Sequence, residues 1–252
     1  MKAFLPNSFL IKPADDLVRI GKNNDGGYVI SNSDINNSEV LISLGISDDW
    51  SFEENFNELK EITIYAYDAS INKKLFYKKI LENFINLRHP KKVFTLIFKL
   101  IKYSKFFSKN NVFHVEQYVG LNSNDVNYCT FDQVLNITKS NNIFLKIDIE
   151  GSEYRFLDSI IKNQNRFTGL AIEFHDCDIH LKKIEEFINN FDLRLIHAHA
   201  NNYAPIRLND KLPLALELTF SKYSNISKEK PLPNILDMPN NKNKEEIELI
   251  IS

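Results

Sequence analysis

Short apolar runs alternate with segments of helical spacing along most of this chain. Each run is rich in β-branched or aromatic residues and too short for a free-standing helix, which is typical of a buried strand. The last run follows a short connection through 201–203, so we expect that strand to be antiparallel. The runs lie at 39–44, 62–67, 112–119, 143–147, 169–174, 193–199 and 214–220. They predict an α/β fold with a Rossmann-like, doubly wound seven-stranded sheet that is mostly parallel.

Two capping boxes mark helix starts between these strands. Ser51 with Glu54 predicts a helix that runs through Lys60. Thr130 with Gln133 predicts the helix that leads to the central strand. Helical spacing also recurs in two later segments, at 154–161 and 179–190.

Residues 71–110 differ from the rest of the chain. Their helical apolar spacing is accompanied by many lysines and scarcely any acids, and Pro90 is expected to divide them into two helices. We interpret them as a helical insertion, or cap, within a single domain that spans 1–252. Three roles fit: a basic cap that attracts an anionic substrate, a helix pair at a membrane surface, or a solvated helical insertion packed on the sheet.

Composition limits the class of protein. A net charge of -2 gives no case for a nucleic-acid partner. The two cysteines, Cys129 and Cys177, form no CxxC pair and fit a reducing cytoplasm. The start of the chain meets Pro6 too early for a signal peptide, and no apolar run approaches a membrane span. We predict a soluble cytoplasmic protein, whose proline-containing tail after residue 230 wraps the domain or frays.

Carboxylates follow the central strand at 143–147. Because strand side chains alternate, Asp148 and Glu150 are expected on one face, at the carboxyl end of a strand where open α/β sheets bind ligands. The alternative is that these acids and Lys146 form a solvated strand end.

A glycine turn and an acid follow the first two strands. Gly45 lies between a strand and a helix, an arrangement typical of phosphate or nucleotide binding. The motif GxGxxG is absent, which argues against pyrophosphate binding and against a nicotinamide-dependent oxidoreductase. Asp68 follows Gly45 by 23 residues, the spacing at which Rossmann-like folds place an acid on ribose hydroxyls. A helix N-cap is the other role that fits Asp68.

The tripeptide Asp25, Gly26, Gly27 is a tight-turn signal. Glycines let backbone amides approach a ligand closely, so the tripeptide fits a binding loop. It equally fits a plain hairpin turn that leads to Tyr28. Both interpretations stay open at the level of the sequence.

These features resemble a known family. The D-x-E-G-x-E segment from Asp148 to Glu153, with its strand, resembles the signature of FkbM-type methyltransferases, which belong to the class I S-adenosylmethionine-dependent enzymes. The resemblance covers most of 17–222 except 71–110, although only Gly45 is kept in the turn after the first strand. It implies a bacterial O-methyltransferase that acts on a carbohydrate or nucleotide-linked sugar, in capsule or other surface-polysaccharide or natural-product biosynthesis. Three further segments look like blocks of that family, at 19–28, 130–135 and 197–202.

The resemblance also implies contacts to S-adenosylmethionine. Gly45 and Ile46 would face its amino-acid part, Asp68 with Ala69 its ribose, and Gly120 with Leu121 its adenine. The 25–27 turn would hold the methionyl carboxylate and amine, with the acceptor pocket as its competing role. The predicted cofactor-binding residues are Asp25, Gly26, Gly27, Gly45, Ile46, Asp68, Ala69, Gly120, Leu121 and Asp148.

A sugar hydroxyl is a poor nucleophile until a base removes its proton. His175, just past the fifth strand, is the first candidate for this base, and Asp148, His197 and His199 are the reserves. A divalent metal held by Asp148, His175, Asp176 or the His197 and His199 pair is chemically possible. It is not favoured, because no tight ligand spacing is present.

Two other functions stay open. If the acceptor is an anionic, phosphate-like group on a glycan, no base is needed, and the lysines of 71–110 would matter more than the histidines. A non-catalytic module that docks on a membrane or a partner protein through 71–110 is the third hypothesis.

Overall fold

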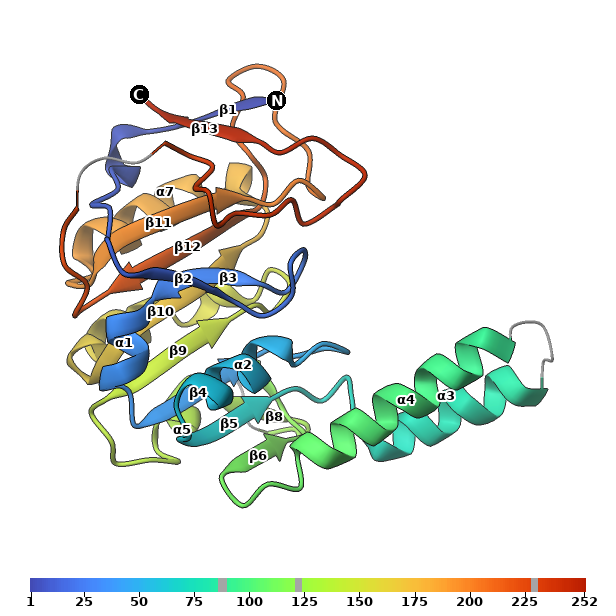
Figure 1. The fold of residues 1–252 in the computed structure, drawn as a ribbon. Coiled ribbons are helices and arrows are strands. Elements are labelled where there is room, and N and C mark those ends of the chain that lie inside the picture. The colour runs from blue at the N-terminus through green and yellow to red at the C-terminus, as the bar shows by residue number, and fades with distance from the viewer. Residues whose placement is uncertain (86–89, 121–123, 228–230) are drawn as a thin grey trace.

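Seven strands form one twisted sheet at the centre of the molecule (Figure 1). The computed structural model describes residues 1–85, 90–120, 124–227 and 231–252. From one edge to the other the strands are β6 (Val112–Val115), β5 (Thr63–Tyr67), β4 (Val40–Leu44), β9 (Ile143–Ile147), β10 (Phe167–Phe174), β12 (Leu216–Ser221) and β11 (Arg194–Ala200). In chain order these are strands 3-2-1-4-5-7-6, so the order reverses between β4 and β9.

Strand pairing confirms the predicted fold class. β6, β5, β4, β9 and β10 pair in parallel, and the last strand of the sheet, β12, is antiparallel to both β10 and β11. Both faces of the central strands are buried. Ile143, Leu145 and Ile147 pack into the core on one face, and Phe144 packs into a second core on the other. Burial on both sides explains why these strands are continuous apolar runs.

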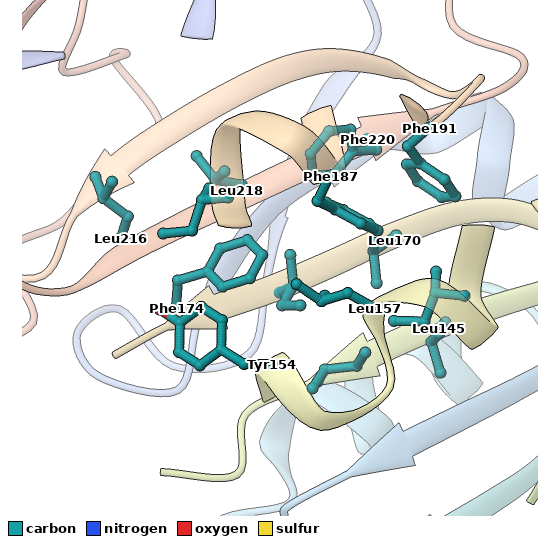
Figure 2. Packing of buried hydrophobic residues seen from close by; sticks show 14 of the residues in the cluster. Leu145, Tyr154, Leu157, Leu170, Phe174, Phe187, Phe191, Leu216, Leu218 and Phe220 are labelled. Atoms are coloured by element: carbon teal, nitrogen blue, oxygen red, sulfur yellow. The ribbon is translucent and has the colours of Figure 1, made fainter. Parts of the chain in front are cut away.

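One face of the sheet is covered by α5 (Phe131–Leu135), α6 (Leu157–Lys162) and α7 (Cys177–Asn190). Figure 2 shows Phe187 and Phe191 packed against Phe220, with Leu157 and Leu170 nearby. Burying each such side chain contributes roughly 1.5–3 kcal/mol. This core fixes the ends of β9 and β10, which carry the candidate site.

The other face is covered by α1 (Asn32–Asn37), α2 (Ser51–Leu59) and the hairpin of β2 (Leu17–Ile20) with β3 (Tyr28–Ser31). Ser51 was expected to cap α2, and this prediction is wrong. Trp50 is the N-cap residue and makes no side-chain cap; the Asp49 carboxylate accepts the Ser51 N–H at 3.1 Å, and Glu54 accepts the Trp50 indole N–H at 3.2 Å. The capping box of Thr130 and Gln133 is confirmed.

Two expected elements are each divided in the structure. The predicted strand 112–119 ends at Val115, where the chain turns, with the Gln117 N–H donating to the Val115 carbonyl at 2.7 Å. Its second half joins a small parallel sheet of β7 (Tyr118–Gly120) and β8 (Tyr128–Thr130). The predicted helix 154–161 is a 3-10 turn (Glu153–Arg155) followed by α6, because Phe156 leaves the helical conformation at φ -136°.

A helical hairpin projects from the body of the protein (Figure 1). It consists of α3 (Lys73–Ile85) and α4 (Pro90–Phe106), so the expected division at Pro90 is confirmed, and the proline opens α4 where its missing N–H costs no helical bond. Tyr103 anchors the base of the hairpin, with its ring 5.6 Å from that of Trp50.

The two ends of the chain meet beside β11. β1 (Lys2–Leu5) pairs in parallel with β13 (Glu248–Ile251). The C-terminal segment before β13 forms loops that cross the domain (Figure 1). The expected wrapping of the tail is therefore confirmed. Two further 3-10 turns span Asn7–Phe9 and Gln164–Arg166. No helix in the described part of the chain has the length and apolar character needed to cross a membrane.

Candidate functional site

A pocket of about 750 Å³ opens at the carboxyl ends of β4, β5 and β9. This is the point where the strand order reverses, and open α/β sheets bind ligands there. Loops that are far apart in the sequence contribute to its lining: 22–26, 45–49, 148–152 and 240–243. The central strands therefore deliver their polar ends to one cavity, as predicted.

Gly45 allows the ends of β4 and β9 to come together. Its φ is +82°, and a Cβ atom at this position would lie 1.7 Å from the Asp148 carbonyl oxygen. Lys146 is buried below it and donates to the Gly45 carbonyl at 2.8 Å, with the Glu53 carboxylate 3.9 Å from the ammonium. Lys146 therefore belongs to the interior, and the interpretation of a solvated strand end is wrong for this residue.

Asp68 organises the turn after Gly45. Its carboxylate accepts the N–H groups of Ile46 and Ser47 at 3.0 and 2.7 Å, and that of Ser70 at 2.6 Å. Gly45, Ile46 and Asp68 all line the pocket, as does Ser70. Ala69 is not among the described residues of the lining. The acid stands where a ribose acid was expected and also fixes the loop beside it.

The turn at 25–27 joins β2 to β3, so the hairpin interpretation is confirmed. Gly26 has φ +86°, and a Cβ there would lie 2.6 Å from the Asp49 carboxylate. A Cβ on Gly27 would lie 1.9 Å from the Lys22 carbonyl oxygen. Both glycines therefore serve close packing, while Asp25 and Gly26 also line the pocket.

The segment after β9 separates its three acids. Asp148 lines the pocket and accepts the Tyr28 hydroxyl hydrogen bond at 3.1 Å. Glu150 does not share its strand face as predicted, because β9 ends at Ile147 and Glu150 turns at φ +54° with a side chain 86% exposed. Glu153 is fully buried and accepts the Gly151 N–H at 3.1 Å, which holds the turn.

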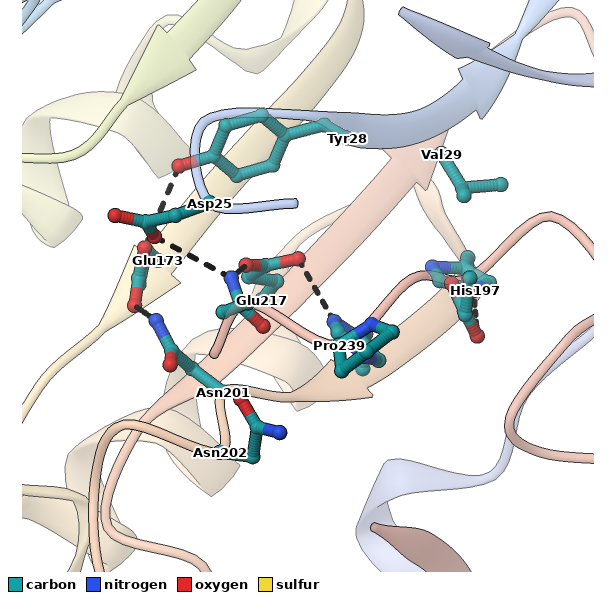
Figure 3. A network of polar contacts seen from close by, with 12 residues as sticks. Asp25, Tyr28, Val29, Glu173, His197, Asn201, Asn202, Glu217 and Pro239 are labelled. Carbon is teal, nitrogen blue, oxygen red and sulfur yellow. Dashed lines mark hydrogen bonds and ion pairs between the residues drawn. The ribbon is translucent and has the colours of Figure 1, made fainter. Parts of the chain in front are cut away.

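Four carboxyl groups lie close together where the hairpin turn meets the sheet, and we call them the acidic floor: Asp25, Asp148, Glu173 and Glu217. Figure 3 shows Asp25 of the turn with Glu173 and Glu217 of the sheet. Burial raises the pKa of Asp25. Burial, followed by the charges of Asp148 and Glu217, holds the pKa of Glu173 well above its usual range. Asn240 donates to Glu217 at 2.6 Å. The four carboxyls therefore resist being ionised all at once, and a cation beside them would favour their charged forms.

His175 lies behind the pocket wall, among acids. Its Nδ1 is 3.0 Å from Glu153, and its Nε2 is 3.5 Å from Glu150 and 3.8 Å from Glu173. Burial lowers the pKa of His175, but the hydrogen bond to Glu153 and the charges of Glu173, Glu153 and Asp148 outweigh it and raise the pKa to about 9. His175 is therefore a cation at neutral pH.

His197 and His199 share a face of β11, as predicted, and face the C-terminal segment. The Nε2 atom of His197 is 3.0 Å from Asp237. His199 lies between Glu217 at 3.1 Å and Glu246 at 3.0 Å. Neither is among the described residues that line the pocket. Their contacts hold the tail against the sheet and, through Glu217, border the acidic floor.

Asp148, Glu173 and His175 offer three ligand atoms within 4.8 Å of one another. Carboxylate and imidazole groups together suit divalent transition metals. The geometry adds Glu173 to the metal ligands considered from the sequence. Within the described chain, Asp176, His197 and His199 stand outside this group.

The pocket ends at two tyrosines on β7 and β8. Tyr118 and Tyr128 line it, with ring centroids 5.5 Å apart, and the lining also includes Val119, which packs into the main core. Gly120 is in β7, beyond the lining, with Tyr128 as the nearest contact of an added Cβ at 3.4 Å. Leu121, the other residue predicted near adenine, lies outside the described residues.

Several residues of the site escaped the sequence analysis. The sequence did carry a signal for Glu173. Because side chains alternate along β10, Glu173 lies on the same sheet face as Ala171, which packs in the core that the β2–β3 hairpin covers. Tyr28 and Asn240 had none: the tyrosine looks like a turn-flanking aromatic, and the asparagine belongs to an Asn-rich tail. Only the packing of the tail over the sheet brings Asn240 to the pocket.

No protein-family model and no curated protein matches the chain. Solved structures do match at low identity. An rRNA methylase from Streptococcus thermophilus is 11% identical, with a TM-score of 0.39 over 74% of this chain and 87% of that chain. A precorrin-6y C5,15-methyltransferase from Geobacter metallireducens is 14% identical, with a TM-score of 0.39 over 75% and 84%. The N-terminal domain of human METTL16 in complex with SAH is 12% identical, with a TM-score of 0.34 over 77% and 65%. The FkbM-type resemblance rests on the sequence motifs alone.

Proposed function

We propose that the protein is an S-adenosylmethionine-dependent methyltransferase that methylates an oxygen of a carbohydrate or nucleotide-linked sugar. One observation carries the proposal: a single pocket at the point of strand reversal gathers the Gly45 turn, Asp68, Asp148 and a pair of tyrosines. These groups come from five separate elements of the chain. Each matches a different part of one nucleoside ligand.

The pocket lining offers a group for each part of the proposed cofactor. Tyr118 and Tyr128 offer aromatic faces to a purine. Asp68 stands at the ribose position, and the Gly45 turn takes the amino-acid part. The acidic floor then lies near the sulfonium, whose positive charge S-adenosylmethionine carries and its demethylated product lacks. The floor therefore favours binding of the methyl donor over the product.

The acceptor side of the pocket is rich in amides. Asn24, Asn240, Asn241 and Asn243 line it. The Oδ1 atom of Asn240 is buried and accepts no hydrogen bond from the described residues. Amide groups donate and accept hydrogen bonds without carrying charge, which suits a ligand rich in hydroxyls.

The contacts favour Asp148 as the proton acceptor. In the proposed step the acceptor oxygen attacks the sulfonium methyl carbon, the C–S bond breaks, and the hydroxyl proton passes to a base. Asp148 lines the pocket, whereas His175 stands behind it and is protonated at neutral pH. If a divalent ion displaced the His175 proton, Asp148, Glu173 and the neutral imidazole would hold it, and it would supply polarisation of the acceptor hydroxyl.

A second acceptor class is supported by two pocket lysines. Lys22 and Lys242 line the same side as the asparagines, although Lys22 is paired with Asp49 at 2.7 Å. A phosphate-like oxygen on a glycan would be attracted by these cations and would need no base.

Calorimetry with S-adenosylmethionine, S-adenosylhomocysteine and NADH tests the cofactor. We expect S-adenosylmethionine to bind most tightly and NADH not to bind. A screen of sugars, nucleotide sugars and phosphorylated glycans with radiolabelled methyl donor then tests the acceptor. Absence of S-adenosylmethionine binding would refute the proposal, and methylation confined to phosphorylated glycans would select the second acceptor class.

A further inference from the structure

The hairpin of α3 and α4 carries an apolar surface that the body of the protein leaves uncovered. On each helix the exposed apolar residues recur at intervals of three or four, one turn apart. Phe94 is 74% exposed and Ile85 is 68% exposed, which is unusual for such large apolar side chains. We call this surface the hairpin face; its residues are Tyr77, Leu81, Phe84, Ile85, Phe94, Ile97, Phe98 and Ile101.

The apolar rows of the two helices lie on the same side of the hairpin. Phe76 in α3 and Leu100 and Tyr103 in α4 are buried between the helices or at their base. At about 100° of rotation per residue, the exposed residues of each helix point about a third of a turn away from these packed residues. The rotation has the same sense, from N- to C-terminus, in both helices. Because the helices run antiparallel (Figure 1), equal rotations in the two helices point to the same face. The hairpin face is therefore one continuous surface.

Lysines surround this surface. The two helices contain nine lysines and one acid, Glu82, within their described bounds. The Lys102 ammonium lies over the Phe98 ring, with its Nζ atom 5.0 Å from the ring centroid, so positive charge stands directly beside the apolar residues. Lys78 is 4.0 Å from Glu82, the single acid available to it on the same helix. The result is an apolar strip edged by strong positive charge.

We infer that the hairpin face docks on the surface of an anionic lipid bilayer. Exposed phenylalanine, leucine and isoleucine beside lysines is the chemistry of helices that lie in the headgroup region of such membranes. If the hairpin faces of two copies of this chain met, the nine lysines of one hairpin would lie against the nine of the other, and the like charges would repel. Nucleic acid would engage the lysines but leave the aliphatic residues without partners.

Docking would place the pocket beside the bilayer. Lys99 in α4 forms an ion pair with Asp48, which lines the pocket, and Tyr103 packs against Trp50 in the same loop region. The base of the hairpin therefore borders the mouth of the pocket. Resting on the proposed function, this position suits an acceptor glycan that is anchored in the membrane by a lipid.

Co-sedimentation of the full chain with vesicles tests the inference. We expect binding to vesicles of phosphatidylcholine with phosphatidylglycerol, weak binding to phosphatidylcholine alone, and release by salt. The double change Phe94→Ser with Phe98→Ser and the triple change Lys73→Gln, Lys74→Gln, Lys78→Gln should each reduce the bound fraction at least about tenfold. A matched triple change of exposed lysines elsewhere, Lys139→Gln, Lys182→Gln and Lys183→Gln, should leave binding unchanged.

Circular dichroism melting and analytical ultracentrifugation of each variant complete the test. All changed positions are exposed or at the hairpin surface, so melting temperatures should match that of the parent protein. No binding to anionic vesicles, or equal loss in the matched control, would overturn the inference. A parent dimer that Phe94→Ser with Phe98→Ser converts to monomer would instead assign the surface to self-association. The assay uses no methyl donor, so its failure is independent of the proposed enzyme activity.

Discussion

The pocket and the helical hairpin use charge in opposite ways. At the pocket, carboxylates such as Asp68 and Asp148 are held by partners far away in the sequence; the contact of Tyr28 with Asp148 joins residues 120 positions apart. In the hairpin, lysines stay in water and helix contacts are local. The pocket therefore depends on the whole fold, whereas the hairpin depends on a short segment. Changes in one region should leave the other intact.

The largest effect is expected from Gly45→Ala. The new Cβ would collide with the Asp148 carbonyl, 1.7 Å away, and φ would remain in the left-handed region. We expect the free energy of unfolding to fall by more than about 2 kcal/mol, with loss of cofactor binding. Urea denaturation measures this. Gly120→Ala is the matched control, because its Cβ meets nothing closer than 3.4 Å; an equal loss there would refute our account of Gly45.

Asp148→Asn is expected to reduce turnover by a factor of about 10²–10⁴, because it removes the proposed base while keeping an oxygen for the Tyr28 hydroxyl. Affinity for S-adenosylmethionine should fall by a much smaller factor, because one carboxyl of the acidic floor loses its charge, and vesicle binding should not change. Steady-state kinetics and calorimetry separate these quantities. Turnover equal to that of the parent protein would transfer the role of base to another group or to an acceptor that needs none.

Asp68→Asn should weaken S-adenosylmethionine binding by about tenfold or more, since a charged acceptor at the ribose position is lost. Turnover at saturating cofactor should fall less than affinity. Calorimetry gives the first quantity and initial rates the second. A variant that binds the cofactor as tightly as the parent protein would restrict Asp68 to holding the Ile46 and Ser47 amides.

The pH dependence distinguishes His175 from Asp148. The folded-state pKa of His175, about 9, lies above its ordinary value of 6.5, so its ion pairs stabilise the fold fully below pH 6.5 and lose that effect as pH rises through 9. The effect should be about 1–3 kcal/mol and absent in His175→Gln. If His175 is the base, turnover should rise up to about pH 9; if Asp148 is, turnover should show no such rise.

The smallest effect is expected from Phe94→Ser. The side chain is exposed and distant from the pocket lining, so turnover on a soluble acceptor should stay within about twofold of the parent value. A larger change would mean that the hairpin and the pocket are coupled, through contacts such as that between Lys99 and Asp48.

The sequence by itself determined the α/β class, the seven strands, the division at Pro90 and the capping box of Thr130, because these depend on local patterns of period and turn chemistry. It also placed Asp68 and Asp148 at strand ends. It failed at Ser51, because Asp49 accepts its N–H and Trp50 is the N-cap residue instead. It also failed at Glu150, where the backbone turns at positive φ, and in 112–119, whose second half pairs with β8.

Only the tertiary structure decided which polar residues meet. Nothing local to Asn240 or Tyr28 shows that each reaches the acidic floor, because that depends on how the tail and the β2–β3 hairpin cross the sheet. The raised pKa of His175 likewise depends on Glu153, which lies 22 positions away in the sequence and approaches it only after β9 and β10 pair. Electrostatic energies depend on distances in space, and a sequence specifies those only between near neighbours.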